Sequence, residues 1–88
     1  MELSEEIIDQ AYRAEAEAFS ALAQQEDKIR DMKLEIEEFK EGSASRLKLE
    51  AQITAEGDRA TELFRELKEA RDHLAHIRDV IAFRALPK

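Results

Sequence analysis

A seven-residue repeat of apolar side chains runs through both halves of this chain and constrains its fold more than any other feature. In each half the apolar positions alternate in steps of three and four residues over about five heptads. Such a sustained 3.5-residue repeat is typical of left-handed coiled coils and not of ordinary amphipathic helices. The repeat occupies Ile8, Ala11, Glu15, Ala18, Leu22, Gln25, Ile29, Met32, Ile36 and Phe39 in the first half, and Leu49, Ile53, Glu56, Ala60, Leu63, Leu67, Ala70, Leu74, Ile77 and Ile81 in the second.

The only strong break in this pattern lies near the midpoint, in residues 41–45. Gly42 can adopt a positive φ angle without steric cost, and Ser43 or Ser45 can cap a helix that follows. Near the N-terminus, Ser4 precedes two glutamates that suit the first turn of a helix. We therefore predict an all-α, two-helix antiparallel coiled-coil hairpin that forms one domain over residues 1–88, with helix 1 at about 4–41, a turn at about 42–45 and helix 2 at about 46–85.

The two halves, folded back about the central turn, pair seam positions whose numbers sum to about 88 or 89. This register places Gln25 opposite Leu63 and Glu56 near Met32. Because an unpaired buried carboxylate is costly, Glu15 and Glu56 are expected to reach water or to find a partner. A partly solvated seam is one interpretation of these polar positions, and a role in setting the register or in function is the other.

Composition excludes several classes of protein. The chain has no cysteine, so it can form neither a disulfide framework nor a thiolate metal site. It lacks the run of about 18 apolar residues that a membrane-spanning helix needs, and its N-terminus is acidic where a signal peptide is basic. The net charge of −7 argues against direct nucleic-acid binding, because phosphate contacts need clustered Lys and Arg. We expect a cytoplasmic protein with no membrane span.

A second apolar strip lies beside the seam and includes Tyr12 and Phe19 in the first half. In an antiparallel hairpin, Phe64 of the second half falls on the same side. Exposed patches of this kind usually mark an interface, either with a second copy or with a foreign helix. Arg71 and Arg78 can lie against Phe19 and Tyr12 as cation–π partners.

The open end of the hairpin gathers more large apolar side chains than two helix ends can cover for each other: Leu3, Ile7, Ile8, Val80, Ile81, Phe83 and Leu86. Covering this surface would contribute several kcal/mol, which is comparable with the stability of a small domain. We therefore predict a homodimer, arranged as a four-helix bundle. The predicted protein-interface residues are Ile7, Tyr12, Phe19, Phe64, Val80, Phe83 and Leu86.

Negative charge is concentrated in the first half. Residues 1–41 carry 13 acids and five bases, whereas residues 42–88 carry eight acids and nine bases. The densest stretch lies next to the turn and forms an acidic tip of Glu35, Glu37, Glu38 and Glu41. Such a run is either a solvated surface or a surface that occupies a basic groove on a nucleic-acid-binding protein.

Catalytic signatures are missing from the sequence, since it contains no nucleophile elbow, phosphate loop or dinucleotide fingerprint. His73 and His76 are weak candidates for a metal site, because zinc needs further ligands and no cysteine is present. We predict a protein without enzyme activity or cofactors that binds itself and an unidentified partner protein, as an adaptor or scaffold. The alternative is a small acidic inhibitor, of the kind a phage or mobile element encodes, that blocks a nucleic-acid-binding protein by charge mimicry.

Overall fold

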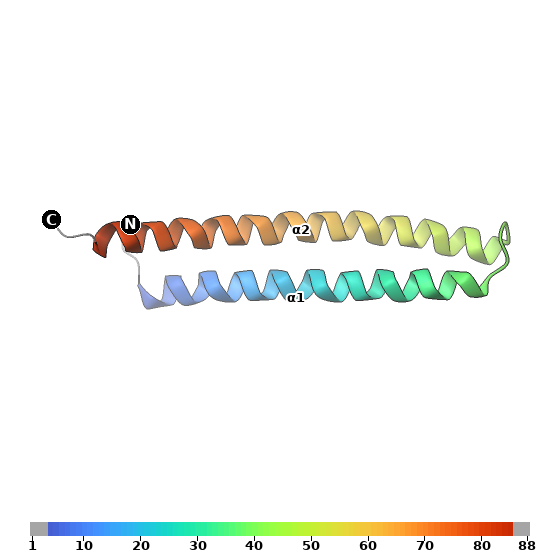
Figure 1. The fold of residues 1–88 in the computed structure, drawn as a ribbon, viewed down its shortest axis with the longest axis horizontal. Coiled ribbons are helices and arrows are strands. Elements are labelled where there is room, and N and C mark those ends of the chain that lie inside the picture. The colour runs from blue at the N-terminus through green and yellow to red at the C-terminus, as the bar shows by residue number, and fades with distance from the viewer. Residues whose placement is uncertain (1–3, 86–88) are drawn as a thin grey trace.

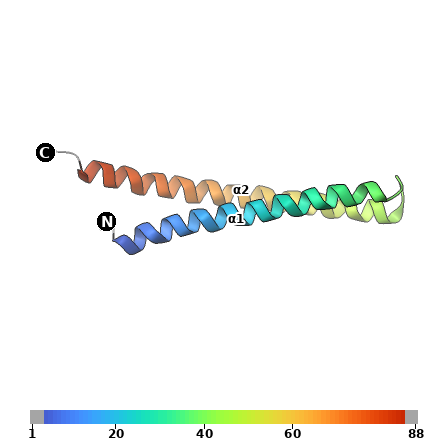
Figure 2. The same cartoon turned by 60° about the horizontal axis from the view of Figure 1, so that its bottom comes forward.

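Two long antiparallel helices make up the structure, a computed structural model that describes residues 4–85 (Figure 1). Helix α1 spans Glu5–Glu35, a short 3-10 helix η1 spans Ile36–Glu38, and helix α2 spans Ala44–Ala85. The hairpin measures 69 × 17 × 15 Å. Figure 2 shows the two helices crossing at a shallow angle, as helices in coiled coils do. The predicted all-helical hairpin is confirmed for the described residues.

Serine side chains cap both helices at their N-termini. The hydroxyl of Ser4 accepts a hydrogen bond from the backbone N–H of Ile7 at 3.3 Å. The hydroxyl of Ser43 accepts one from the backbone N–H of Arg46 at 3.2 Å. Gly42 lies between the helices with a φ of +81°, which a residue with a side chain adopts only at a cost. These caps satisfy N–H groups that the helix itself leaves without partners.

The first helix ends earlier than predicted. It was expected to continue to about residue 41, but α1 ends at Glu35, and Phe39 is already extended with φ −103° and ψ 141°. The glutamates of the acidic tip oppose a longer helix, because carboxylates are unfavourable next to the negative C-terminal end of a helix. The chain between the helices is therefore residues 39–43, and α2 begins at Ala44 instead of near residue 46.

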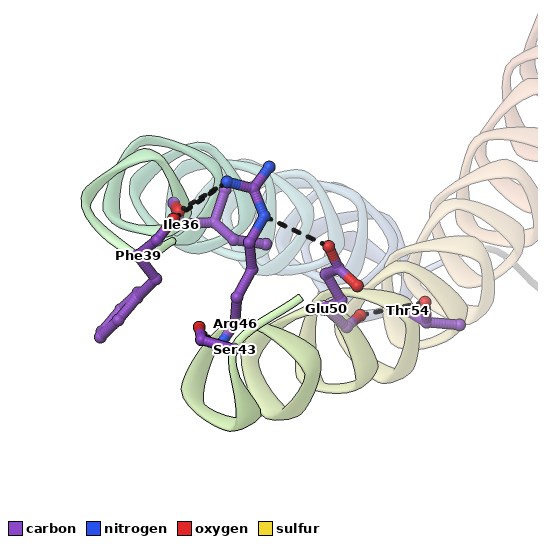
Figure 3. A network of polar contacts seen from close by, with 6 residues as sticks. All are labelled: Ile36, Phe39, Ser43, Arg46, Glu50 and Thr54. Atoms are coloured by element: carbon purple, nitrogen blue, oxygen red, sulfur yellow. Dashed lines mark hydrogen bonds and ion pairs between the residues drawn. The ribbon is translucent and has the colours of Figure 1, made fainter. Parts of the chain in front are cut away.

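Arg46 stabilises the end of the first arm (Figure 3). One terminal nitrogen of its guanidinium donates to the carbonyl oxygens of Phe39, at 3.1 Å, and Ile36, at 3.5 Å. Its Nε donates to the carboxylate of Glu50 at 3.4 Å. Arg46 precedes Ile53 by seven residues, so it occupies the first seam position of α2, at the tip of the hairpin. A cation at this position satisfies the carbonyls that the early end of α1 releases.

The core is a single row of side chains between the helices. One buried cluster near the open end contains Ala11, Leu74 and Ile77, with Ile7 and Ile8 packed against it. A second cluster at mid-length contains Leu22, Leu63 and Leu67, flanked by Ala18, Ala21 and Ala60. Ile36 and Leu49 are buried near the tip. Most of the surface of each helix therefore stays in water.

The predicted register holds for some seam residues and not for others. Ala11 shares a buried cluster with Ile77, and Leu22 shares one with Leu67, as the sum of about 88 or 89 requires. Leu63 also belongs to the cluster of Leu22, whereas Gln25, expected opposite Leu63, bonds to Glu56 instead.

Candidate functional site

Two pairs of ring and guanidinium groups bridge the helices on one side of the seam. The guanidinium carbon of Arg71 lies 5.9 Å from the ring centre of Phe19, and that of Arg78 lies 5.4 Å from the ring centre of Tyr12. Both distances are within the range of a cation–π interaction, so the predicted pairs are confirmed. The two pairs are seven residues apart on each helix and therefore lie on the same side of the hairpin.

Hydrogen bonds reinforce both pairs. The Nε of Arg71 donates to the carboxylate of Glu15 at 3.2 Å, and the Nε of Arg78 donates to the hydroxyl of Tyr12 at 3.4 Å. Glu15, one of the two carboxylates that interrupt the seam, has thus found a partner. Together with Leu74, these residues line an open hollow of about 310 Å³.

The side chains around these pairs form the surface that we call the aromatic face. Phe19 is 55 % exposed and Phe64, seven residues before Arg71 on α2, is 59 % exposed. Ala16 lies between Tyr12 and Phe19 on α1, and on the tip side of Phe64 a Cβ added at Gly57 would meet nothing within 4 Å. The aromatic face consists of Tyr12, Ala16, Phe19 and Ala23 of α1 and Gly57, Phe64, Arg71 and Arg78 of α2.

The opposite side of the hairpin, which we call the charged face, has a different character. It carries Glu17 and Asp31 of α1 and Arg59, Glu62, Glu66, Glu69, His73 and His76 of α2, all of which are exposed, as well as Ala14, Ala21 and Val80 beside the seam. Within residues 4–85, no group of three or more His, Cys, Asp or Glu side chains is placed to hold a metal ion. His73 and His76 are therefore two exposed histidines without a third ligand beside them.

A polar cluster bridges the seam between its middle and the tip. The amide nitrogen of Gln25 donates to the backbone oxygen of Glu56, at 2.9 Å, and also to its carboxylate. The ammonium group of Lys28 lies 3.0 Å from the same carboxylate. Donation from Gln25, followed by that from Lys28, lowers the pKa of Glu56 below its ordinary value. Both carboxylates that the sequence places in the seam are thus partnered.

At the open end, the predicted interface residues divide into packed and exposed ones. Ile7 packs against the buried cluster of this end and Val80 is half-buried, whereas Phe83 is 76 % exposed. Ile81, predicted to continue the seam, is also exposed. Leu86 lies outside the described residues. The apolar surface left open here belongs to the last turns of α2.

Comparison with known proteins yields no matching family model, no matching curated protein and no matching solved structure. The case for a function therefore rests on the geometry of the hairpin. In the described part of the chain, no helix is both long enough and apolar enough to span a membrane.

The four glutamates of the acidic tip are all exposed, and none of them forms an ion pair with another residue of the range 4–85. The structure also contains two features that the sequence-based prediction missed, the contacts of Arg46 and the bond between Gln25 and Glu56. The first could have been noticed from the seven-residue spacing to Ile53. The second depends on the register, which the repeat does not determine.

Proposed function

We propose that this chain is a non-enzymatic protein-interaction module that works as a dimer of hairpins joined through the aromatic face. The observation that carries the proposal is the exposure of Tyr12, Phe19 and Phe64 along one side of the hairpin. Aromatic and arginine side chains, which this face carries together, are enriched in protein interfaces, while the charged face keeps the assembly soluble. A four-helix bundle is the natural product of two such hairpins.

The energy available from this surface is of the right size. Burying a whole Phe side chain contributes about 1.5–3 kcal/mol, and Phe19 and Phe64 each have more than half of their surface in water. Covering the exposed part of both rings in two copies would thus contribute roughly 4 kcal/mol, before any gain from Tyr12 or the open end. The closed dimer would then serve as a scaffold or adaptor for a further protein.

Sedimentation of two matched variants tests the proposal. Phe64→Glu introduces a charge into the aromatic face, whereas Leu34→Glu introduces the same charge at a side chain that is 67 % exposed and lies away from the seam on α1. We expect the wild type and Leu34→Glu to sediment at about twice the 10.1 kDa mass of the chain at micromolar concentration. Phe64→Glu should shift toward the monomer.

A fully helical wild type that sediments at 10.1 kDa at micromolar concentration would contradict the proposal. An identical shift in both variants would also contradict it, because it would show that added charge, and not the aromatic face, governs association. Helicity measured by circular dichroism on the same samples separates dissociation from unfolding.

The acidic tip supports a second candidate function, an inhibitor that occupies a basic groove on a nucleic-acid-binding protein. Its four exposed glutamates have no ion-pair partner within residues 4–85 and are free to attract a basic surface. Charge mimicry predicts that reversing all four to lysine abolishes capture of such a protein and that capture weakens as salt rises. Capture that persists at high salt would favour the aromatic face instead.

A further inference from the structure

We propose that the two hairpins of the dimer lie antiparallel, with a two-fold axis across the middle of the aromatic face, so that each Arg71 guanidinium meets Glu26 of the other copy. This inference rests on the dimer proposed above and specifies the orientation of its second copy. It follows from the order of the aromatic, basic and acidic side chains along the length of the hairpin on this side.

The order of side chains is set by the two observed ring and guanidinium pairs. Arg71 crosses the seam and lies over α1, where it contacts both Phe19 and Glu15. Seven residues further toward the tip on each helix are Glu26 of α1 and Phe64 of α2, which the heptad repeat places on the same side. Phe19 lies near the middle of α1 and Phe64 near the middle of α2. Along α1, the guanidinium of Arg71 and the carboxylate of Glu26 therefore lie on opposite sides of the centre of the hairpin.

An antiparallel arrangement of two copies brings these opposite charges together. A two-fold axis perpendicular to the hairpin places α1 opposite α1 of the other copy and exchanges the levels on either side of the centre. The Arg71 guanidinium, which lies over α1, then meets the carboxylate of the other copy's Glu26. The other copy's Phe64 meets the aliphatic part of the Arg71 side chain on α2. Symmetry repeats both contacts, so the central region holds two complementary pairs of charges.

A parallel arrangement lacks this complementarity. With the two-fold axis along the hairpin, α1 faces α2 of the other copy at the same level. The Arg71 guanidinium would then meet the region of the other copy's Arg71 and Lys68, which places like charges together. The same arrangement would bring the acidic tips of both copies to one end of the bundle, where their glutamates repel one another.

The position and shape of the aromatic face suit a second copy. The hairpin is 69 Å long and 17 Å wide, and the aromatic face occupies the middle part of one of its sides. Its centre lies at mid-length, so an antiparallel copy overlaps the hairpin along nearly all of its length. Ala16, Ala23 and Gly57 present little side-chain volume and allow the helices to approach closely.

Distances between spin labels test the orientation, and the absence of native cysteine allows single labels to be placed cleanly. Gln24→Cys labels the middle of the hairpin on an exposed position outside the aromatic face, and Lys40→Cys labels the exposed tip. In the antiparallel dimer, the two Gln24→Cys labels should lie within roughly 30 Å, because each hairpin is 15 Å thick. The two Lys40→Cys labels should be separated by nearly the 69 Å length of the hairpin.

Each outcome decides a separate question. Short distances at both positions would show a parallel dimer and overturn the inference, while leaving the proposed interaction module in place. A monomer mass with no defined distance at either position would overturn the dimer itself. Correctly separated labels, near at mid-length and far at the tip, support the antiparallel arrangement.

Charge reversal provides a second, independent test. We expect Glu26→Arg to raise the dimer dissociation constant at least tenfold, because the new cation would face Arg71 of the other copy. Glu17→Arg makes the same change on the charged face and should leave the constant within about threefold of the wild type, as surface charges far from an interface do. An unchanged constant for Glu26→Arg would overturn the inference.

Discussion

Toward the open end of the hairpin, the buried core ends between Ile77 and Ile81, which lie one helical turn apart on α2. Substituting each of them by alanine tests this position of the end of the core. Ile77 is 1 % exposed and belongs to the cluster with Ala11 and Leu74, whereas Ile81 is 41 % exposed. Both are isoleucines on the seam of the same helix, so the change in helix propensity is the same in both variants. The difference between the two variants therefore reports burial alone.

The expected magnitudes follow from the atoms removed. Isoleucine loses three carbon atoms when it becomes alanine, and each buried methylene contributes about 0.8 kcal/mol. Ile77→Ala should cost about 3 kcal/mol once the cavity is included, which is a large part of the stability of a small domain. Ile81→Ala removes atoms already in contact with water and leaves no closed cavity, so its cost should be about 1 kcal/mol.

Urea unfolding, followed by circular dichroism at one fixed protein concentration, measures both variants. The concentration must be the same throughout because association stabilises the folded state. The dependence of the free energy of unfolding on urea should stay unchanged, and only the midpoint should move. Equal losses in the two variants would refute the reasoning, because they would show that Ile81 is as well covered as Ile77.

Three further predictions concern the tip, the glycines and the polar cluster in the seam. Arg46→Ala should cost about 1–2 kcal/mol in urea unfolding, because it removes the donor to the carbonyl of Phe39 and a second donor to the carbonyl of Ile36, which also accepts from the N–H of Phe39. Arg59→Ala removes an exposed ion pair and should cost less than about 0.5 kcal/mol. Equal costs would contradict the role of Arg46. Gly57→Ala should stabilise the helix by about 0.5–1 kcal/mol, whereas Gly42→Ala should destabilise the turn by about 1 kcal/mol, because of these two glycines only Gly42 has a positive φ. Thermal unfolding of the two variants measures the difference. A gain of stability in both would contradict the turn geometry. The pKa of Glu56 is lowered, so its ionised carboxylate stabilises the fold above its ordinary pKa of 4.5, and this stabilisation is lost as pH falls through the folded-state pKa. Glu56→Gln should therefore show a smaller fall in melting temperature between pH 6 and pH 3 than the wild type. An equal fall in both proteins would contradict the polar cluster.

Much of the candidate site could be predicted because it follows from spacing along each helix. Tyr12 and Phe19 are seven residues apart, as are Phe64, Arg71 and Arg78, so each set occupies one side of its helix whatever the partner does. To predict the two ring and guanidinium pairs, it was then enough to assume that the helices run antiparallel and that these two sides lie next to each other. Long arginine side chains tolerate small differences in register, so the two pairs form as predicted.

Short side chains do not tolerate such differences, and the partners of Gln25 and Glu56 could not be predicted for this reason. An amide reaches only a few ångströms, so a shift of one turn replaces one neighbour by another. The exposure of Ile81 has a similar origin. Ile77 and Ile81 are successive seam residues of α2, and only the position where the helices cease to cover each other separates the two.

Local features of the amino-acid sequence are enough to form two amphipathic helices joined by a turn, because helical periodicity, serine caps and a flexible glycine act over a few residues. The tertiary structure decided where the first helix ends, which register the arms adopt and which apolar residues remain in water. These depend on contacts between residues distant in sequence, such as those of Arg46 with the backbone of Ile36 and Phe39. A repeat of seven residues is compatible with several registers, and only the packing and hydrogen bonds of the folded hairpin select one.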